Sequence, residues 1–139
     1  MNTGNNFKLS FFEPTSPGGL VKCTIHKDGK LGFSREAIKI MNIDVGGSVK
    51  IAKNTADASD ESLYLVVFSS AVEGAFKIVK AGQYFYLYTK HLFDRLHIDY
   101  ADQHKVIYDI EELDMQGQKV FKLNRRIKSR KVKQQKSEA

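Results

Sequence analysis

The stretch "IHKDGKLGF", residues 25–33, reads as two short strands joined by a turn. Ile25 ends one run of alternating apolar and polar residues, and Leu31 and Phe33 continue the same alternation beyond the turn. Such alternation is typical of strands with one buried face. Asp28-Gly29 lies between the two runs, and glycine tolerates the positive φ that tight hairpin turns require. The stretch therefore predicts a β-hairpin.

The residues that follow extend this hairpin into a unit of strand, strand, helix, strand and strand. Ser34 is a candidate N-cap, because its hydroxyl can accept a hydrogen bond from a backbone N–H group at the start of a helix. The helix is expected over 37–41, and a third strand is expected to start at Val49. After a polar loop at 54–62, the apolar run "LYLVVF", 63–68, predicts a fourth strand that is buried on both faces or nearly so.

The same pattern recurs about fifty residues later in "IVKAGQYFY", residues 78–86. A shift of 53 positions superposes the two copies. It places Cys23, Ile25, Gly29, Leu31 and Phe33 on Phe76, Ile78, Gly82, Tyr84 and Tyr86. The turn glycine is kept, and every inward position stays apolar or aromatic. We therefore expect Tyr84 and Tyr86 to pack in the core, while Phe85 faces outward.

A second helix and a second pair of strands follow this hairpin. Thr89 is the candidate N-cap of the helix. One face of the helix carries Leu92, Phe93 and Leu96. Strands are predicted around 106–108 and at "KVFKL", 119–123, and "EELDMQGQ", 111–118, is predicted to be the loop between them.

These patterns predict one α+β domain, mostly β, over residues 20–123. It consists of two ββαββ copies, at 20–69 and 75–123. A single unit of about 50 residues buries too little apolar surface to be stable alone, so the copies are expected to interlock around one core. Residues 1–19 form an N-terminal segment with a candidate short strand at "FKLSFF", and the polar, basic residues 124–139 are expected to form a disordered tail.

The first copy resembles the AbrB-like swapped-hairpin domain. "CTIHKDGKLGFSREAIKIMNIDVGGSVKIA" is similar to that domain in its strand, short turn ending in glycine, apolar strand, single short helix and glycine turn before another hairpin. The resemblance covers about 21–68 and, more weakly, 75–123. It implies that two hairpin units interlock as a pseudo-dimer barrel in one chain, the tandem arrangement of the MraZ proteins. It also implies DNA binding by a transcription regulator or an antitoxin, through basic residues around the first hairpin turn and the helix.

The positive charge of the chain is concentrated at its C-terminus. Residues 119–139 hold nine basic residues and one acidic residue, whereas residues 1–118 hold thirteen basic and fifteen acidic residues. A basic segment of this kind binds nucleic-acid phosphates without reading sequence. The sequence therefore predicts phosphate or groove contacts by cations of both copies and of the tail. These cations are Lys27, Lys30, Arg35, Lys39, Lys80, Lys90, Arg125, Arg126, Lys128, Arg130, Lys131 and Lys133.

No catalytic or metal-binding pattern is present, so we expect neither an enzyme nor a cofactor. The histidines, which have none of the spacings of a zinc site, are His26, His91, His97 and His104. No second cysteine accompanies Cys23, and the inward position of Cys23 favours a small, inert core residue over a nucleophile. No phosphate-binding glycine motif and no nucleophile elbow occur in the sequence.

Duplex DNA is the first expected partner, and two alternatives stay open. One is a protein partner docked on the slightly acidic body. The other is RNA or a single DNA strand, with bases stacked on the strand 84–88 through Tyr84, Phe85 and Tyr88. The chain is expected to act as a monomeric pseudo-dimer or as a higher homo-oligomer. A lone cysteine, no signal-peptide pattern and no apolar run of membrane-spanning length predict a soluble, cytoplasmic protein without a membrane partner.

Overall fold

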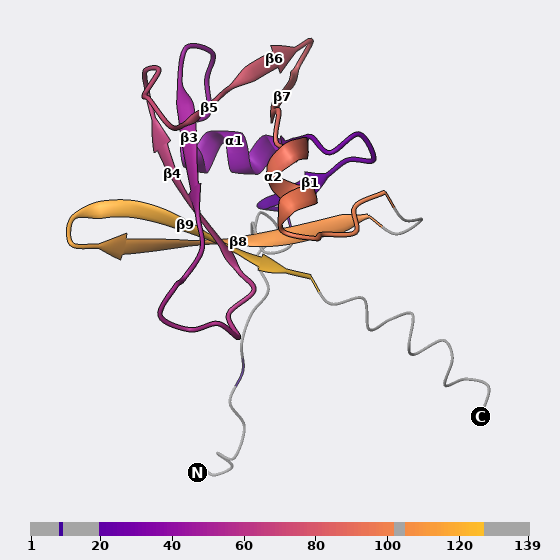
Figure 1. Cartoon of the computed structure of the whole chain (residues 1–139). Helices are drawn as coiled ribbons and strands as arrows, with labels where there is room; N and C mark the ends of the chain where they lie inside the picture. The colour runs from indigo at the N-terminus through magenta and orange to yellow at the C-terminus, as the bar shows by residue number, and fades with distance from the viewer. Residues whose placement is uncertain (1–8, 10–19, 102–104, 127–139) are drawn as a thin grey trace.

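A computed structural model describes residues 9, 20–101 and 105–126 of the chain. This part of the chain contains nine strands and two short helices (Figure 1). The strands are β1 (Lys22–Ile25), β2 (Leu31–Phe33), β3 (Ser48–Ala52), β4 (Leu63–Phe68), β5 (Phe76–Lys77), β6 (Val79–Ala81), β7 (Tyr84–Leu87), β8 (Val106–Met115) and β9 (Gln118–Arg125). The helices are α1 (Arg35–Met41) and α2 (Lys90–Arg95). The predicted α+β, mostly β class is confirmed.

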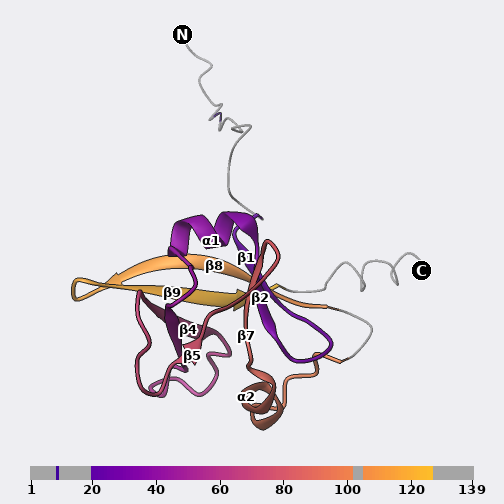
Figure 2. The same ribbon diagram turned by 90° about the horizontal axis from the view of Figure 1, so that it is seen from above.

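The strands form one antiparallel sheet that is nearly closed into a barrel. Their order in the described chain is β5-β3-β4-β9-β8-β1-β2-β7-β6. β5 pairs with β3 at one edge and β6 pairs with β7 at the other, although Ile78 alone separates β5 from β6. The N–H group of Ile78 donates to the carbonyl oxygen of Gly47 (3.1 Å), so the two edges meet at this residue. Seen from above, α1 and α2 lie on opposite sides of the barrel (Figure 2).

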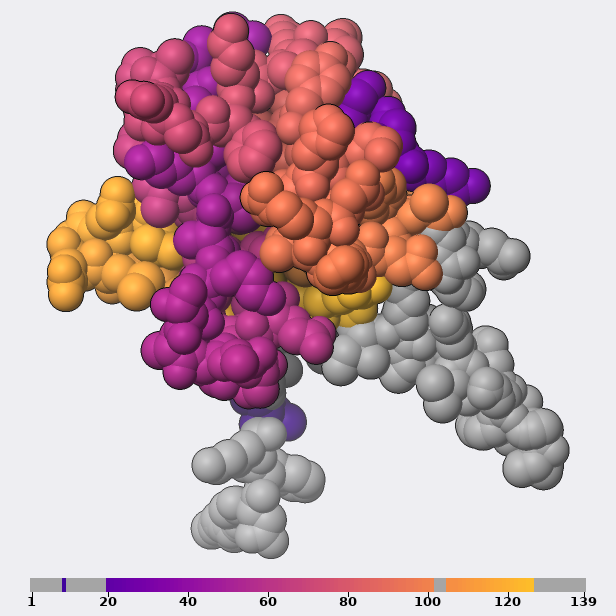
Figure 3. Space-filling view, in the orientation of Figure 1, coloured from indigo at the N-terminus to yellow at the C-terminus, as the bar shows by residue number. Residues whose placement is uncertain are grey.

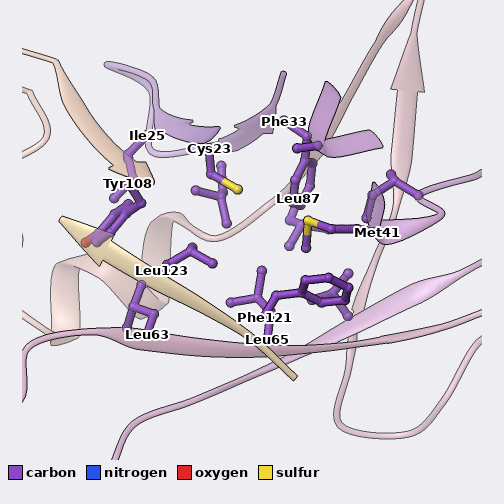
Figure 4. Close-up of a cluster of buried hydrophobic side chains, with 14 of the residues drawn as sticks. Cys23, Ile25, Phe33, Met41, Leu63, Leu65, Leu87, Tyr108, Phe121 and Leu123 are labelled. Carbon is purple, nitrogen blue, oxygen red and sulfur yellow. The ribbon is translucent and has the colours of Figure 1, made fainter. Parts of the chain in front are cut away.

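Apolar side chains from both halves of the chain fill the barrel interior. Figure 4 shows such side chains pointing toward one another from strands of both halves and from α1. The labelled residues are Cys23, Ile25, Phe33, Met41, Leu63, Leu65, Leu87, Tyr108, Phe121 and Leu123. Full burial of a large apolar side chain stabilises a fold by about 1.5–3 kcal/mol. The shared cluster therefore couples the stability of the first half to that of the second.

The first hairpin has the predicted register. Cys23 pairs with Phe33 on the inward side of the sheet. The N–H group of His26 donates to the carbonyl oxygen of Lys30 (2.9 Å), which leaves a loop of three residues between them. Gly29 ends this loop with a φ of 85°, the left-handed conformation that a hairpin loop of this length requires.

The second hairpin has a different register, so the prediction for its aromatic side chains is wrong. Tyr84 is 74% exposed and Tyr86 is half-buried, whereas Phe85 packs against the core and Leu87 is fully buried. Ala81 pairs with Tyr84, which leaves a loop of two residues, one fewer than in the first hairpin. Because side chains alternate between the two faces of a strand, this difference turns each following side chain to the opposite face.

The two helices begin with different contacts. The hydroxyl of Ser34 accepts a hydrogen bond from the N–H group of Ala37 (3.1 Å), and the predicted N-cap is confirmed. Thr89 occupies the predicted N-cap position of α2, but its side chain makes no capping hydrogen bond. Its buried hydroxyl donates to the carbonyl oxygen of Gly29 in the first hairpin (2.8 Å), and is directed away from the helix end.

β8 and β9 form a long hairpin that runs through the loop predicted at 111–118. β8 continues to Met115 and β9 begins at Gln118, so Gln116 and Gly117 alone form the turn. Both turn residues have positive φ, as a type I′ turn requires. The tip of this hairpin, yellow in Figure 3, projects from one side of the molecule. The loop prediction is therefore wrong, because the turn is confined to two residues.

β4 is buried on one face and half-buried on the other. Leu63 and Leu65 are buried, whereas Tyr64 and Val66 are half-buried, so the expectation of burial on both faces holds only in part. The candidate strand at the N-terminus lies outside the described residues except for Leu9, which is not part of a strand.

Candidate nucleic-acid interface

One outer face of the barrel wall carries three tyrosines beside polar and basic side chains. Thr24 pairs with Gly32, and Gly32 pairs with Tyr86, so these residues form one row across β1, β2 and β7. Because side chains alternate along a strand, neighbours two positions away share this outer face. We call this set the tyrosine face; its members are Lys22, Thr24, His26, Lys30, Gly32, Tyr84, Tyr86 and Tyr88.

The tyrosine face is hollowed at Gly32. The hollow has a volume of about 520 Å³, and its walls include Lys22, Thr24, His26, Lys30, Tyr84 and Tyr86. An ideal Cβ atom on Gly32 would lie 2.6 Å from Nε2 of His26, so the imidazole leans across the place where a larger residue would put its side chain. Gly32 is not among the described glycines with positive φ. Glycine at this position therefore leaves room for the imidazole and is not needed for backbone conformation.

The three tyrosine rings are presented to solvent to different degrees. Tyr84 is 74% exposed and Tyr88 is 61% exposed, whereas Tyr86 between them is half-buried. The rings of Tyr86 and Tyr88 meet edge to face, with centroids 5.5 Å apart. Aromatic rings gain much of their stabilising effect from burial, so an exposed row of them is a candidate contact surface.

Lys30 holds a fixed positive charge above two of these rings. Its Nζ lies 4.7 Å from the ring centroid of Tyr86 and 5.5 Å from that of Tyr88, distances at which a cation is attracted to the face of a ring. The same Nζ forms an ion pair with Asp28 (3.2 Å). The hydrogen bond to Asp28 raises the pKa of Lys30, so the amine stays charged at neutral pH. Lys30 is thus the predicted cation that the structure places within the candidate site.

Two other predicted cations lie at the same end of the barrel. Lys27 is exposed in the loop of the first hairpin. Lys90 packs beside that loop, because its Cβ would lie 2.7 Å from an ideal Cβ on Gly29. The Nζ of Lys90 forms an ion pair with Asp94 one turn along α2 (3.0 Å). Lys27 and Lys90 therefore extend the basic character of the tyrosine face past the hairpin loop.

The remaining predicted cations of the barrel lie elsewhere. Arg35 and Lys39 are exposed on α1, which begins at the end of β2 opposite to Lys30. The Nζ of Lys80 lies 5.7 Å from the ring centroid of Phe85, a ring that packs against the core. The structure thus divides the predicted barrel cations among separate surfaces instead of joining them into one stripe.

The described part of the chain ends at Arg126, beside β8. Nη2 of Arg126 forms an ion pair with Oδ1 of Asp109 (2.6 Å), and Asp109 pairs with Lys22 of β1 in the sheet. β9 includes Arg125, so it extends beyond the predicted end of the second copy. The other predicted tail cations, Lys128, Arg130, Lys131 and Lys133, lie outside the described residues.

The histidines and the cysteine are dispersed. His26 belongs to the tyrosine face, His91 and His97 are exposed near α2, and His104 lies outside the described residues. Within the described ranges, no three histidine, cysteine, aspartate or glutamate side chains gather as metal ligands. Cys23 is buried among apolar side chains, and this burial raises the pKa of its thiol far above the ordinary range.

Sequence patterns alone did not place His26, Gly32 and Tyr86 together on the tyrosine face. The signal for them was the length of the two hairpin loops, since a two-residue loop after Ala81 places Tyr86 opposite Gly32. Comparisons with protein families, with characterised proteins and with solved structures find no match to this chain. In the described part of the chain, no helix is long and apolar enough to cross a membrane.

Proposed function

We propose that this protein is a non-enzymatic nucleic-acid-binding protein that uses the tyrosine face as its contact surface. The observation that carries the proposal is the row of exposed tyrosines beside Lys30 on one sheet face. Aromatic rings on a sheet stack with bases, and neighbouring cations hold the phosphates. Lys22 at the far end of the hollow supplies a second cation.

The C-terminal segment adds electrostatic affinity in this proposal. Residues 127–139 hold five basic residues and one acidic residue, and the described part of the chain ends beside β8, the neighbour of β1. If the protein neutralises about six phosphates, the logarithm of its affinity falls with the logarithm of salt concentration at a slope of about −5. Such contacts position the protein on the backbone, while the tyrosine face contacts bases.

We also propose that the barrel is a tandem pair of ββαββ swapped-hairpin units. The pairing of β2 with β7 and of β4 with β9 supports this, because equivalent strands of the two copies meet. β1 pairs with β8. In the same way β5, which belongs to the counterpart of β1 in the second copy, pairs with β3, the counterpart of β8. Asn42 in "MNID", 41–44, and His97 in "LHID", 96–99, each have a φ of 59° after the helix, which makes the two helix ends alike.

The regulatory role follows from the resemblance to AbrB-like proteins, and duplex DNA is the ligand that this resemblance implies. A transcription regulator or an antitoxin-like protein would use the tandem barrel to position its contacting residues on DNA. Direct contacts from the barrel would then come from Lys27, Lys30 and Lys90, which lie in or beside the first hairpin loop.

The test is a binding titration with fluorescently labelled duplex DNA, single-stranded DNA and RNA at about 50 mM and about 200 mM salt. We expect binding at the lower concentration and a steep loss of affinity at the higher one. A chain ending at Arg126 separates the two sources of affinity: it should keep a weaker affinity with a shallower salt slope. Absence of binding to all three ligands at the lower salt concentration would overturn the proposal, and a protein partner would then become the leading alternative.

A further inference from the structure

We propose that the tyrosine face is built for single-stranded nucleic acid, with one unpaired base seated in the hollow that His26, Gly32 and Tyr86 line. This inference rests on the proposed function and names the ligand of the same site. It differs from the duplex DNA that the family resemblance implies.

The hollow has the shape and lining that a single base requires. Gly32 removes the side chain from the centre of a row whose flanking members, Thr24 and Tyr86, keep theirs. A glycine inside a strand often marks a close approach of another group, and here the imidazole of His26 approaches Gly32. The imidazole of His26 and the ring of Tyr86 both line the hollow. A planar group that enters it therefore meets two planar side chains.

The exposure of the tyrosine rings favours an unpaired strand over a duplex. Tyr84, at 74% exposed, offers its ring to a ligand without any rearrangement of the core. A ring can stack only on a base whose own face is free, and bases in a duplex already stack on their neighbours. Tyr84 and Tyr86 are two positions apart along β7, hence about 6.6–6.8 Å apart along the strand axis. An extended single strand can place successive bases on side chains spaced in this way, with one in the hollow and the next on Tyr84.

Two lysines are placed to hold the phosphates on either side of the seated base. Lys22 and Lys30 line the hollow from β1 and from the start of β2. Lys30 is held over Tyr86 by its ion pair with Asp28, and a side chain that is already ordered loses less freedom on binding. Only a few cations border the hollow. This small number suits the single phosphate backbone of an unpaired strand better than the two backbones of a duplex.

The first test is Gly32→Ala, which adds a methyl group to the wall of the hollow and displaces the imidazole of His26. The added methyl group would press on His26, but only on the far end of an exposed side chain that can swing aside. The fold should therefore persist. We expect affinity for labelled oligothymidylate or oligouridylate to fall about tenfold, in the range expected for loss of one stacked base. Affinity for duplex DNA should stay within about twofold.

The second test separates stacking from hydrogen bonding, and it does not require that Gly32→Ala folds. Tyr84→Ala should weaken single-strand binding by about tenfold, whereas Tyr84→Phe, which keeps the ring, should retain it. The protein contains no tryptophan and six tyrosines, three of them on the tyrosine face. Quenching of tyrosine fluorescence by oligothymidylate is therefore expected, and Tyr84→Ala should reduce that quenching.

The matched control for charge is a pair of lysine variants. Lys30→Ala and Lys122→Ala each remove one positive charge that lies over a tyrosine ring, since Lys122 Nζ is 5.9 Å from the ring centroid of Tyr64 on β4. Lys30→Ala should weaken single-strand binding several-fold more than Lys122→Ala. Equal effects would mean that net charge alone determines affinity, and would count against a built site.

The outcomes of these tests distinguish the single-strand inference from the proposal of nucleic-acid binding in general. Binding of either DNA or RNA single strands that depends on Gly32 and on the Tyr84 ring supports the inference, and comparison of the two strands shows whether the sugar matters. Equal affinity for duplex and single strands, unchanged by Gly32→Ala and Tyr84→Ala and without tyrosine quenching, would overturn the inference and leave nucleic-acid binding in place. Absence of binding to every nucleic acid at about 50 mM salt would overturn both.

Discussion

The hydroxyl of Thr89 donates a hydrogen bond to the carbonyl oxygen of Gly29, 60 residues earlier in the chain, over 2.8 Å. Thr89 is fully buried at the start of α2, and Gly29 ends the loop of the first hairpin. Lys30 follows directly and lies over the rings of Tyr86 and Tyr88. The buried bond between the two halves of the chain therefore fixes the loop that positions a cation on the tyrosine face.

Thr89→Val should destabilise the protein by about 1–3 kcal/mol. The substitution keeps the shape of the side chain but leaves the carbonyl oxygen of Gly29 without its buried donor. Urea denaturation followed by circular dichroism measures the free energy of unfolding. Thr55→Val is the control, because Thr55 is exposed in the loop between β3 and β4, and it should change stability by no more than about 0.5 kcal/mol. Equal effects of the two variants would contradict a structural role for Thr89.

Ser34→Ala should cost about 1–2 kcal/mol of stability, the upper part of the range for an N-cap. The Ser34 hydroxyl accepts hydrogen bonds from the N–H groups of Ala37 and Lys22 (3.1 Å each) and donates to the carbonyl oxygen of Leu20 (2.6 Å). It thereby joins the start of α1 to the start of β1. The same denaturation experiment tests this, with Ser69→Ala at an exposed position as the control. A loss no larger than that of the control would show that water replaces these bonds.

Cys23 should resist thiol reagents in the folded protein. Its side chain is buried in the barrel core, and this burial raises the pKa of the thiol, so the reactive thiolate is scarce at neutral and mildly alkaline pH. We expect slow reaction with a disulfide reagent in buffer and complete reaction of one thiol per chain in denaturing urea. Rapid native labelling would show that β1 opens readily. Labelling of Thr89→Val should be faster than that of the unmodified chain if the bond to Gly29 stabilises this half of the barrel.

The loop between β3 and β4 should contribute stability that is lost in acid. A hydrogen bond from Tyr64, together with bonds from the N–H of Ser62 and the amide of Asn54, lowers the pKa of Asp60 well below its usual range. The folded state therefore binds a proton at Asp60 less readily than the unfolded state. This contribution is complete above the ordinary aspartate pKa of about 4 and disappears as pH falls through the lower pKa of the folded state.

Tyr64→Phe isolates this effect. The variant should be less stable than the unmodified chain at about pH 7, and the difference should shrink as the pH approaches about 2. Urea midpoints measured across this range provide the check. A difference that stays constant with pH would mean that packing of Tyr64, and not its bond to Asp60, sets the stability of the loop.

The sequence allowed accurate prediction where the signals are local. The first hairpin, its turn at Gly29 and the cap at Ser34 each depend on a few neighbouring residues, and turn glycines and capping hydroxyls act over that range. The buried face of α2 was also evident, because Phe93 occupies the centre of its apolar spacing. These elements were sufficient to indicate a mostly β domain.

The candidate site could not be predicted in this way because it depends on pairing between distant strands. Tyr86 reaches the outer face because the loop after Ala81 has two residues, one fewer than in the first hairpin. The alternation across 76–86 contains no mark of that shorter loop. The extension of β8 was hidden for another reason: beyond Ile110 the hairpin projects from the barrel, so its residues do not alternate between core and solvent.

The two faces of β7 should respond very differently to alanine. Leu87→Ala removes a fully buried side chain from the shared core and should cost about 2–5 kcal/mol. Tyr84→Ala removes an exposed ring and should change stability by about 0.5 kcal/mol or less, while it weakens single-strand binding. Urea denaturation of both variants measures the contrast directly. If Tyr84→Ala cost as much as Leu87→Ala, β7 would have the opposite register, and the tyrosine face would be part of the core instead of a binding surface.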